Sequence, residues 1–213
     1  MMTTMTVAKA LNAGLRRALE ADPKVLLYGE DIGSLGGVFR VTEKLQAQFG
    51  PDRVLDSPLA EAGLIGTAIG MAQRGYRPVV ELQFDGFVFP GFDQITQQLA
   101  KMRFRSHGRV QLPVVVRFPY GGGIGAIEHH SESPEAYFAH TPGLVVVAPS
   151  TPLDAYWMMA NAIDEAVRNA VAVGADPDQL AGVDNFCWCD PVQSEKTPDG
   201  RYKLAQLVRA NKA

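Results

Sequence analysis

Five short, largely apolar runs alternate with segments of helical periodicity, and this alternation limits the folds that are open to the chain. Each run is the length of a strand, and they lie at residues 25–28, 54–56, 78–84, 113–118 and 144–148. Strands that are apolar on both faces and separated by helices are typical of a parallel sheet. The sequence therefore predicts an α/β fold, a parallel sheet with helices on both faces, in which ligands bind beyond the carboxyl ends of the strands.

The segments between the apolar runs predict the helices. An opening helix repeats apolar residues at Val7, Leu11, Leu15 and Leu19. The other expected helices cover residues 39–49, 60–74, 89–105, 133–140 and 152–163. The helix at 89–105 is the longest of the central ones, and its inner stripe is Phe92, Ile95, Leu99 and Met102.

Composition excludes several classes of protein. With 213 residues, 46% of them hydrophobic, the chain can bury one sizeable core. Its 20 basic and 23 acidic residues form no long basic cluster, which argues against nucleic acid as a partner. No apolar run approaches the roughly 20 residues that cross a bilayer, so no membrane partner is expected. The N-terminus lacks the pattern of a secretory signal, and Cys187 and Cys189 are interpreted as reduced thiols, which together predict a cytoplasmic location.

Glu61 is the first candidate for chemistry. It opens a helix whose next residues, Ala62, Gly63, Leu64 and Ile65, are small or apolar. A carboxyl group in such surroundings loses solvation and can serve as a proton donor or hold a short hydrogen bond to a ring nitrogen. The alternative is a first-turn glutamate that complements the helix dipole and faces water.

His130, beside His129 in a loop after the run Gly121-Gly122-Gly123, is the second candidate. Imidazole is the natural proton shuttle near neutral pH, and adjacent histidines point in different directions, so one of the two would face a shared site. A surface pair on a loop is the alternative. The glycine run could contact a ligand through backbone N–H groups or could simply form a flexible turn. Among the nearby aromatics Phe84, Phe87, Phe89 and Phe92, one could stack on a planar ring.

Taken as an ordered set, the motifs around these candidates are highly specific. They are Tyr28–Asp31, Ser57–Gly63, Gln83–Gln94, His130–Ala136 and Thr141–Ser150. Over residues 5–163 the chain resembles the beta subunit of the decarboxylating component of pyruvate and branched-chain 2-oxo acid dehydrogenases. The resemblance implies a transketolase-type pyrimidine-binding fold, which is a thiamine diphosphate-binding fold. The His130–Ala136 motif argues against a deoxyxylulose-phosphate synthase, and the form of that motif favours branched-chain substrates over pyruvate.

The resemblance also implies roles for individual residues. Glu61 would hydrogen-bond the N1′ atom of the cofactor's aminopyrimidine, Phe87 would stack on that ring, and Leu59 would contact it through its backbone. His130 would serve proton transfer and reductive acylation of the lipoyl group. The diphosphate and magnesium ligands of the family lie on the alpha subunit, so no metal ligand is expected in this chain. The implied partners are that alpha subunit, a second beta chain in a heterotetramer, and a lipoyl-bearing acyltransferase.

Residues 164–213 do not continue this pattern, since no further apolar run follows the helix at 152–163. The strand and C-terminal domain expected there are missing, which leaves the family's potassium site open. The segments 164–169, 174–178, 184–188 and 207–210 instead resemble a fragment of phosphoribosylformylglycinamidine synthase. We therefore expect residues 1–163 to form the pyrimidine-binding domain. Residues 164–213 are expected to be a foreign, mostly helical or irregular tail that extends the preceding helix, forms no independent domain, and is cut first by proteases between 174 and 200.

Two functions from different classes are compatible with this sequence. The first is the beta-chain half of a thiamine-dependent 2-oxo acid dehydrogenase, truncated and inactive without an alpha subunit. The second is a non-catalytic or chimeric module that retains only the fold. Decarboxylation of 2-oxo acids after mixing with an alpha subunit distinguishes the two.

Overall fold

The computed structural model describes residues 5–126, 128 and 130–171, and their side chains as far as residue 164. The predictions made for residues 172–213, including the two cysteines and the resemblance to the purine enzyme, lie outside this part. Within it, the helix that begins at Pro152 continues without a break to Val171. The expectation that the first part of the tail extends this helix is therefore confirmed.

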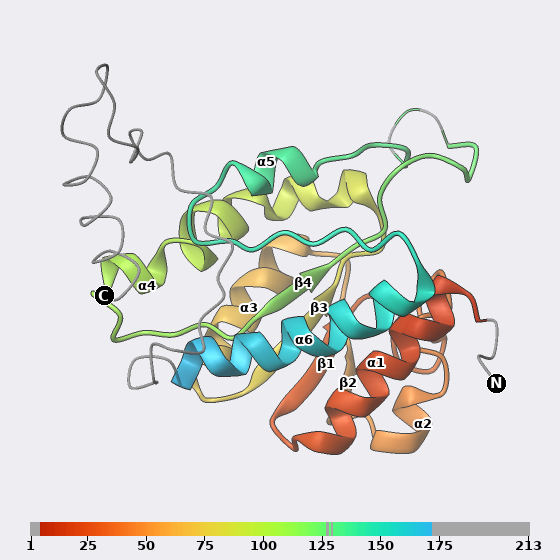
Figure 1. The fold of residues 1–213 in the computed structure, drawn as a ribbon, viewed down its shortest axis with the longest axis horizontal. Helices are drawn as coiled ribbons and strands as arrows, with labels where there is room; N and C mark the ends of the chain where they lie inside the picture. The colour runs from red at the N-terminus through yellow and green to blue at the C-terminus, as the bar shows by residue number, and fades with distance from the viewer. Residues whose placement is uncertain (1–4, 127, 129, 172–213) are drawn as a thin grey trace, which may run out of the picture. The chain divides into compact units, whose positions relative to one another are not determined.

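The core of the fold is a four-stranded parallel sheet (Figure 1). Its strands are β1 (Val25–Gly29), β2 (Val54–Asp56), β3 (Arg77–Glu81) and β4 (Val115–Arg117), in the order β2-β1-β3-β4. In the register, Leu27 of β1 faces Val54 on one side and Val79 on the other, and Val79 in turn faces Val115. All strands are parallel, so their carboxyl ends share one edge, as the sequence predicts.

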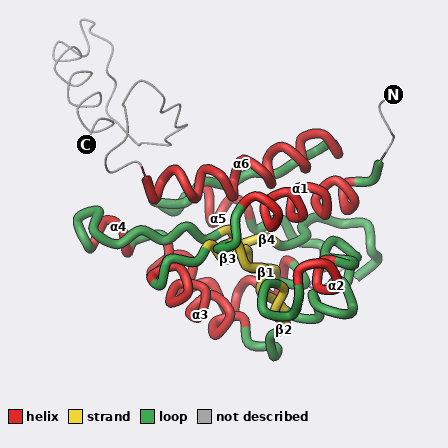
Figure 2. Tube along the Cα trace, turned by 90° about the horizontal axis from the view of Figure 1, so that it is seen from below, coloured by secondary structure: helices red, strands yellow, loops and turns green. Residues whose placement is uncertain are grey.

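Helices cover both faces of this sheet. Figure 2 shows α1 (Val7–Ala21) and α6 (Pro152–Val171) on one side of the strands and α3 (Glu61–Gln73) on the other. Leu15, Leu27 and Met159 belong to the apolar cluster between the sheet and the α1–α6 layer. Leu64, Val80 and Phe138 belong to the second cluster, on the α3 side. The parallel sheet with helices on both faces is therefore confirmed.

The helix expected over residues 39–49 is wrong for most of its length. Only α2 (Leu45–Phe49) is helical, and Arg40 and Lys44 before it adopt left-handed backbone conformations with φ of 59° and 66°. Hydrogen bonds to distant parts of the chain determine the conformation of this segment instead. The Thr42 hydroxyl donates to the Ile32 carbonyl at 2.7 Å, and the Asn12 amide donates to the Val41 carbonyl at 2.7 Å.

The single helix expected over residues 89–105 is three shorter pieces. They are a 3₁₀ segment η1 (Asp85–Gly91), a π-helical segment η2 (Gln94–Leu99) and α4 (Met102–Arg105). Pro90 lies inside the first piece and has no N–H to donate, which interrupts regular α-helical bonding there. The predicted inner stripe is nevertheless correct, because Ile95 is buried and Phe92, Leu99 and Met102 pack against the same cluster.

The fifth expected strand, at residues 144–148, does not form. This segment follows α5 (Glu135–Ala139) and pairs with no strand among the described residues. At Gly143, φ is 94°, and the backbone passes directly against the Ala100 carbonyl at the end of η2. Val145, Val146 and Val147 are left 71%, 38% and 51% exposed. An apolar run predicts a buried strand only where neighbours cover it, and here they do not.

No helix in the described part of the chain is both long and apolar enough to span a membrane.

Candidate active site

Glu61 is the first residue of α3 and lies just past the carboxyl end of β2. Its residue is only 7% exposed, although no side chain caps the helix at Ala60. Gly91 at the end of η1 approaches it closely, since a Cβ atom at Gly91 would lie 3.3 Å from the Glu61 carbonyl oxygen. The prediction that Glu61 is shielded at a helix N-terminus beyond a strand is confirmed, and the alternative of a water-facing glutamate is wrong.

A second carboxyl group, Glu30, lies beside Glu61. Glu30 follows β1 directly, is 3% exposed, and neither of its buried carboxylate oxygens has a hydrogen-bond partner. Burial, and then the negative charge of Glu61, raise the pKa of Glu30 to about 7, while the Ala60 backbone acts in the opposite direction. Glu30 therefore keeps its proton to a higher pH than an exposed glutamate does.

His130 is held by aromatic side chains at the other end of η1. Its ring stacks on Phe84, with centroids 3.9 Å apart and planes inclined by 25°. Phe87 meets it edge-on at 5.3 Å. The side chain of His130 is 16% exposed, so the imidazole is largely enclosed yet still reachable. The structure thus brings His130 and Phe87 together, as the candidate set requires.

Asp85 is a buried carboxylate beneath His130. It is the first residue of η1, is 2% exposed, and accepts hydrogen bonds from the backbone N–H groups of Gly86 and Glu132. Its Oδ1 lies 4.0 Å from His130 Nδ1. Sequence reasoning included Asp85 and Glu30 in its motifs but gave neither a role, because neither residue type nor spacing reveals which acid becomes buried against another site residue.

The glycine loop and His130 enclose a small cavity of about 180 Å³. Its lining includes Phe84, Asp85, Tyr120, Gly121 and His130. Gly121 has φ of 81° and donates its backbone N–H to the Glu132 carbonyl at 2.7 Å, which ties the two ends of the loop together. In the described part of the chain, no group of three or more His, Cys, Asp or Glu side chains is placed to hold a metal ion.

Leu59 lies two residues before Glu61 and is 67% exposed. It is therefore open to solvent beside the start of α3. The segment η1 joins the parts of the site, since Asp85 and Phe87 contact or approach His130 at one end and Gly91 packs on Glu61 at the other.

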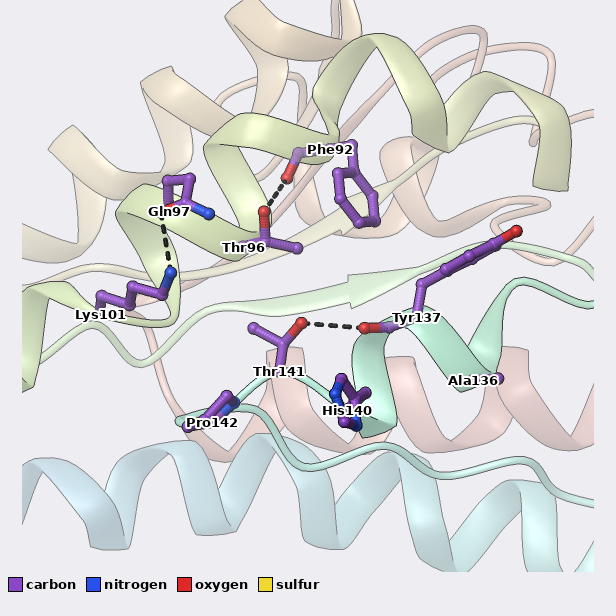
Figure 3. A pocket seen from close by; sticks show the side chains of 9 residues that line it. All are labelled: Phe92, Thr96, Gln97, Lys101, Ala136, Tyr137, His140, Thr141 and Pro142. Carbon is purple, nitrogen blue, oxygen red and sulfur yellow. Dashed lines mark hydrogen bonds between the residues drawn. The ribbon is translucent and has the colours of Figure 1, made fainter.

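A larger cavity of about 510 Å³ lies between η2 and α5 (Figure 3). Several of its polar side chains form hydrogen bonds within their own segments. The Thr96 hydroxyl donates to the Phe92 carbonyl, the Thr141 hydroxyl to the Tyr137 carbonyl, and Lys101 to the Gln97 side chain, at 2.8–2.9 Å. None of Glu61, Glu30, Asp85 and His130 lines it, so we place the candidate active site at the smaller cavity and the Glu61 pair.

Comparison with known families agrees with this fold. The family profile described as "Transketolase, pyrimidine binding domain" matches residues 3–176. The chain therefore belongs to the transketolase pyrimidine-binding domain family. Among solved structures it is similar to "Split gene transketolase, inactive beta4 tetramer", with a TM-score of 0.60 and 18% identity over 76% of this chain and 49% of that one. That likeness concerns the fold alone.

Within this family, the chain is most informatively compared with beta subunits of 2-oxo acid dehydrogenases. The chain is 71% identical over 160 residues to "Pyruvate dehydrogenase E1 component subunit beta" of Leifsonia xyli, covering 75% of this chain and 48% of that protein. It is 56% identical over 160 residues to "3-methyl-2-oxobutanoate dehydrogenase subunit beta" of Mycobacterium tuberculosis, covering 75% of this chain and 46% of that protein. The resemblance found in the sequence is thereby confirmed. The chain spans about half the length of the curated relatives that it matches.

Proposed function

We propose that this chain contributes the pyrimidine-side half of a thiamine diphosphate site in a decarboxylating 2-oxo acid dehydrogenase. The observation that carries the proposal is a carboxylic acid, Glu61, buried at the start of α3 beside a second buried acid, Glu30. A pair of this kind is costly to retain in a fold and is typical of acid–base sites. The relatives at 71% and 56% identity point to the same class of enzyme.

The residues present fit an aminopyrimidine. Both oxygens of Glu30 are buried and without partners, whereas Glu61 keeps a small exposed fraction through which a ligand can reach it. Phe87 supplies an aromatic ring near the same segment, and Leu59 is open to solvent beside the start of α3. We assign the N1′ contact to Glu61, ring stacking to Phe87 and a backbone contact to Leu59. When bound, thiamine diphosphate supplies the nucleophilic carbon and the electron sink for decarboxylation.

The roles of the protein groups follow from their surroundings. Glu61 would hydrogen-bond the ring nitrogen through its carboxyl group, and its enclosure by α3 and η1 would keep water from competing for that bond. His130 would move a proton at its imidazole during transfer of the acyl group to a lipoyl sulfur, since its ring is enclosed but reachable. Magnesium and diphosphate would be held by an alpha subunit, which is the first proposed partner. A second beta chain and a lipoyl-bearing acyltransferase are the others, and the cytoplasm is the proposed location.

The test is reconstitution with a cognate alpha subunit. The purified full chain alone, with thiamine diphosphate, magnesium and a 2-oxo acid, should release no carbon dioxide, because it encodes one side of the site. The mixture with the alpha subunit should decarboxylate 2-oxo acids, and pyruvate and 3-methyl-2-oxobutanoate assayed side by side give the substrate preference. Decarboxylation by the chain alone would overturn the division between subunits. A stable mixed assembly without activity would overturn the catalytic assignment in favour of an assembly module.

A further inference from the structure

We infer that Asp85 is a positioning residue that fixes His130 in the tautomer protonated at Nδ1, leaving Nε2 as the nitrogen that gains and loses the proton. The inference deepens the proposed function and rests on it for the role of His130. It rests on geometry for the effect of Asp85.

Asp85 lies on the Nδ1 side of the His130 ring. The Asp85 Oδ1 atom lies 4.0 Å from Nδ1. Phe84 stacks on the face of the ring at 3.9 Å, and Phe87 packs edge-on, so the two aromatic contacts fix the plane of the imidazole. Within that plane, the orientation that the structure shows puts the Nδ1 side towards the carboxylate.

Asp85 is itself held in place by the backbone. Its Oδ1 accepts a hydrogen bond from the Gly86 N–H at 2.9 Å, and its Oδ2 accepts one from the Glu132 N–H, two residues beyond His130. With 2% of the residue exposed, these bonds fix the carboxylate and reduce the cost of burying it. The anchor thus connects the start of η1 to the loop that carries His130.

The chemical consequence concerns which nitrogen carries the proton. A neutral imidazole has one donor and one acceptor nitrogen, and the partner of one decides the state of the other. A carboxylate near Nδ1 accepts and cannot donate, so it favours a proton there. Replacing it by an amide can reverse the preference, because an amide N–H can donate to Nδ1 and leave the proton on Nε2. Both His130 and Asp85 line the cavity of about 180 Å³, where Nε2 would meet a substrate.

A purely structural role for Asp85 gives a different expectation. If Asp85 served only to hold the Glu132 N–H, then Asp85→Asn would preserve its function, because the amide oxygen can accept the same bond. The positioning role and the purely structural role therefore predict different results for Asp85→Asn. The difference is visible when the measurement reports which ring nitrogen of His130 is protonated, and not when it reports stability alone.

The experiment is long-range ¹H–¹⁵N spectroscopy of the histidine rings in the full chain, at a pH where they are neutral. The His130 signals are identified by their loss in His130→Gln. We expect the Nδ1–H pattern in the wild type, a shift to the Nε2–H pattern in Asp85→Asn, and no change in Asp52→Asn, an exposed carboxylate outside the site. A wild-type ring protonated at Nε2 overturns the inference without need of any variant, and so does an Asn variant whose tautomer is unchanged.

Activity of the alpha-subunit assembly provides the second arm. Asp85→Asn should slow acyl transfer to lipoyl groups by about 10²-fold or more, since a misplaced general acid–base group loses most of its contribution. The Asp52→Asn control should match the wild type. A tautomer that shifts while acyl transfer stays unchanged leaves the positioning claim standing and overturns the proposed role of His130, so the two failures are distinguishable.

Discussion

The two acid–base clusters of the site are built in different ways. Glu30 and Glu61 lie directly at the ends of regular elements, after β1 and at the start of α3. Asp85 and His130 lie on irregular backbone, a 3₁₀ segment and a loop, and are joined by aromatic stacking and side-chain-to-backbone bonds. Both clusters are buried, but only the positions of Glu30 and Glu61 are set by the strands of the sheet.

The two clusters therefore depend on different parts of the fold. The carboxyl pair is fixed by the parallel register, so it needs little support beyond the packing of α3. The His130 cluster depends on a few specific contacts and can shift when one of them is lost. We expect the geometry of the Glu30–Glu61 pair to be disturbed by changes in core packing or in ionisation. We expect the geometry of the Asp85–His130 pair to be disturbed by the loss of a single local contact.

The largest expected effect is that substitutions of Glu61 and of His130 slow different steps of the proposed reaction. In the assembly with an alpha subunit, Glu61→Gln should slow proton exchange at the cofactor's C2 position by about 10²–10⁴-fold, because the acid that supports deprotonation is lost. His130→Gln should leave that exchange at the wild-type rate and slow acyl transfer to the lipoyl group instead. Exchange followed by deuterium incorporation checks the first step, and wild-type exchange in Glu61→Gln would remove Glu61 from its role.

Core packing should matter most on the Glu61 side. Leu64, on the same helix as Glu61, is 1% exposed, so Leu64→Ala should lower the free energy of unfolding by about 2–5 kcal/mol. The matched control is Leu153→Ala on α6, which is 57% exposed and should change stability by about 0.5 kcal/mol or less. Urea denaturation at constant slope measures both, and equal costs would contradict the packing described for α3.

In the irregular segment after α5, stability should be sensitive to substitution of a single glycine. Gly143 has φ of 94° and its backbone lies against the Ala100 carbonyl, so Gly143→Ala should cost about 1–3 kcal/mol through strain and a steric clash. Gly122→Ala is the control, since Gly122 has no left-handed conformation and no neighbour within 4 Å of an added Cβ. Thermal unfolding of both variants decides the matter, and a Gly143→Ala protein as stable as the control would show that the segment adapts freely.

The smallest expected effect is a pH dependence from Glu30. Its pKa is raised from 4.5 to about 7 on folding, so between these values the native state keeps a proton that the unfolded chain loses. The free energy of unfolding should therefore fall as pH rises through this window, by about 1–2 kcal/mol in total after allowance for solvent screening.

Glu30→Gln should remove this slope, whereas Glu20→Gln, at an exposed position, should keep it. Urea midpoints measured from pH 4 to pH 8 provide the comparison. The contrary outcome is a wild-type protein whose stability rises with pH across this range and a Glu30→Gln variant that behaves identically. That result would show that Glu30 is not the titrating group.

Much of the architecture followed from local pattern. Largely apolar runs located β1 to β4, and helical spacing located α1, α3 and α6, because burial on both faces or on one stripe leaves a direct trace in the sequence. The helix expected at 39–49, the unbroken helix at 89–105 and the strand at 144–148 were wrong. In those segments hydrogen bonds such as that of Thr42 to Ile32, the missing N–H of Pro90 and the close approach of Gly143 to Ala100 outweighed periodicity.

The sequence by itself determined the fold class and the family, and it predicted a shielded Glu61 beside the alternative of a water-facing one, because strand ends in a parallel sheet and a small, apolar helix start are local features. Only the tertiary structure decided that Glu30 shares a buried environment with Glu61 and that Asp85 lies under His130. Those pairs join residues that are 31 and 45 positions apart. Their proximity depends on strand order and on how η1 and the His130 loop pack, and neither is encoded in the spacing of the residues themselves.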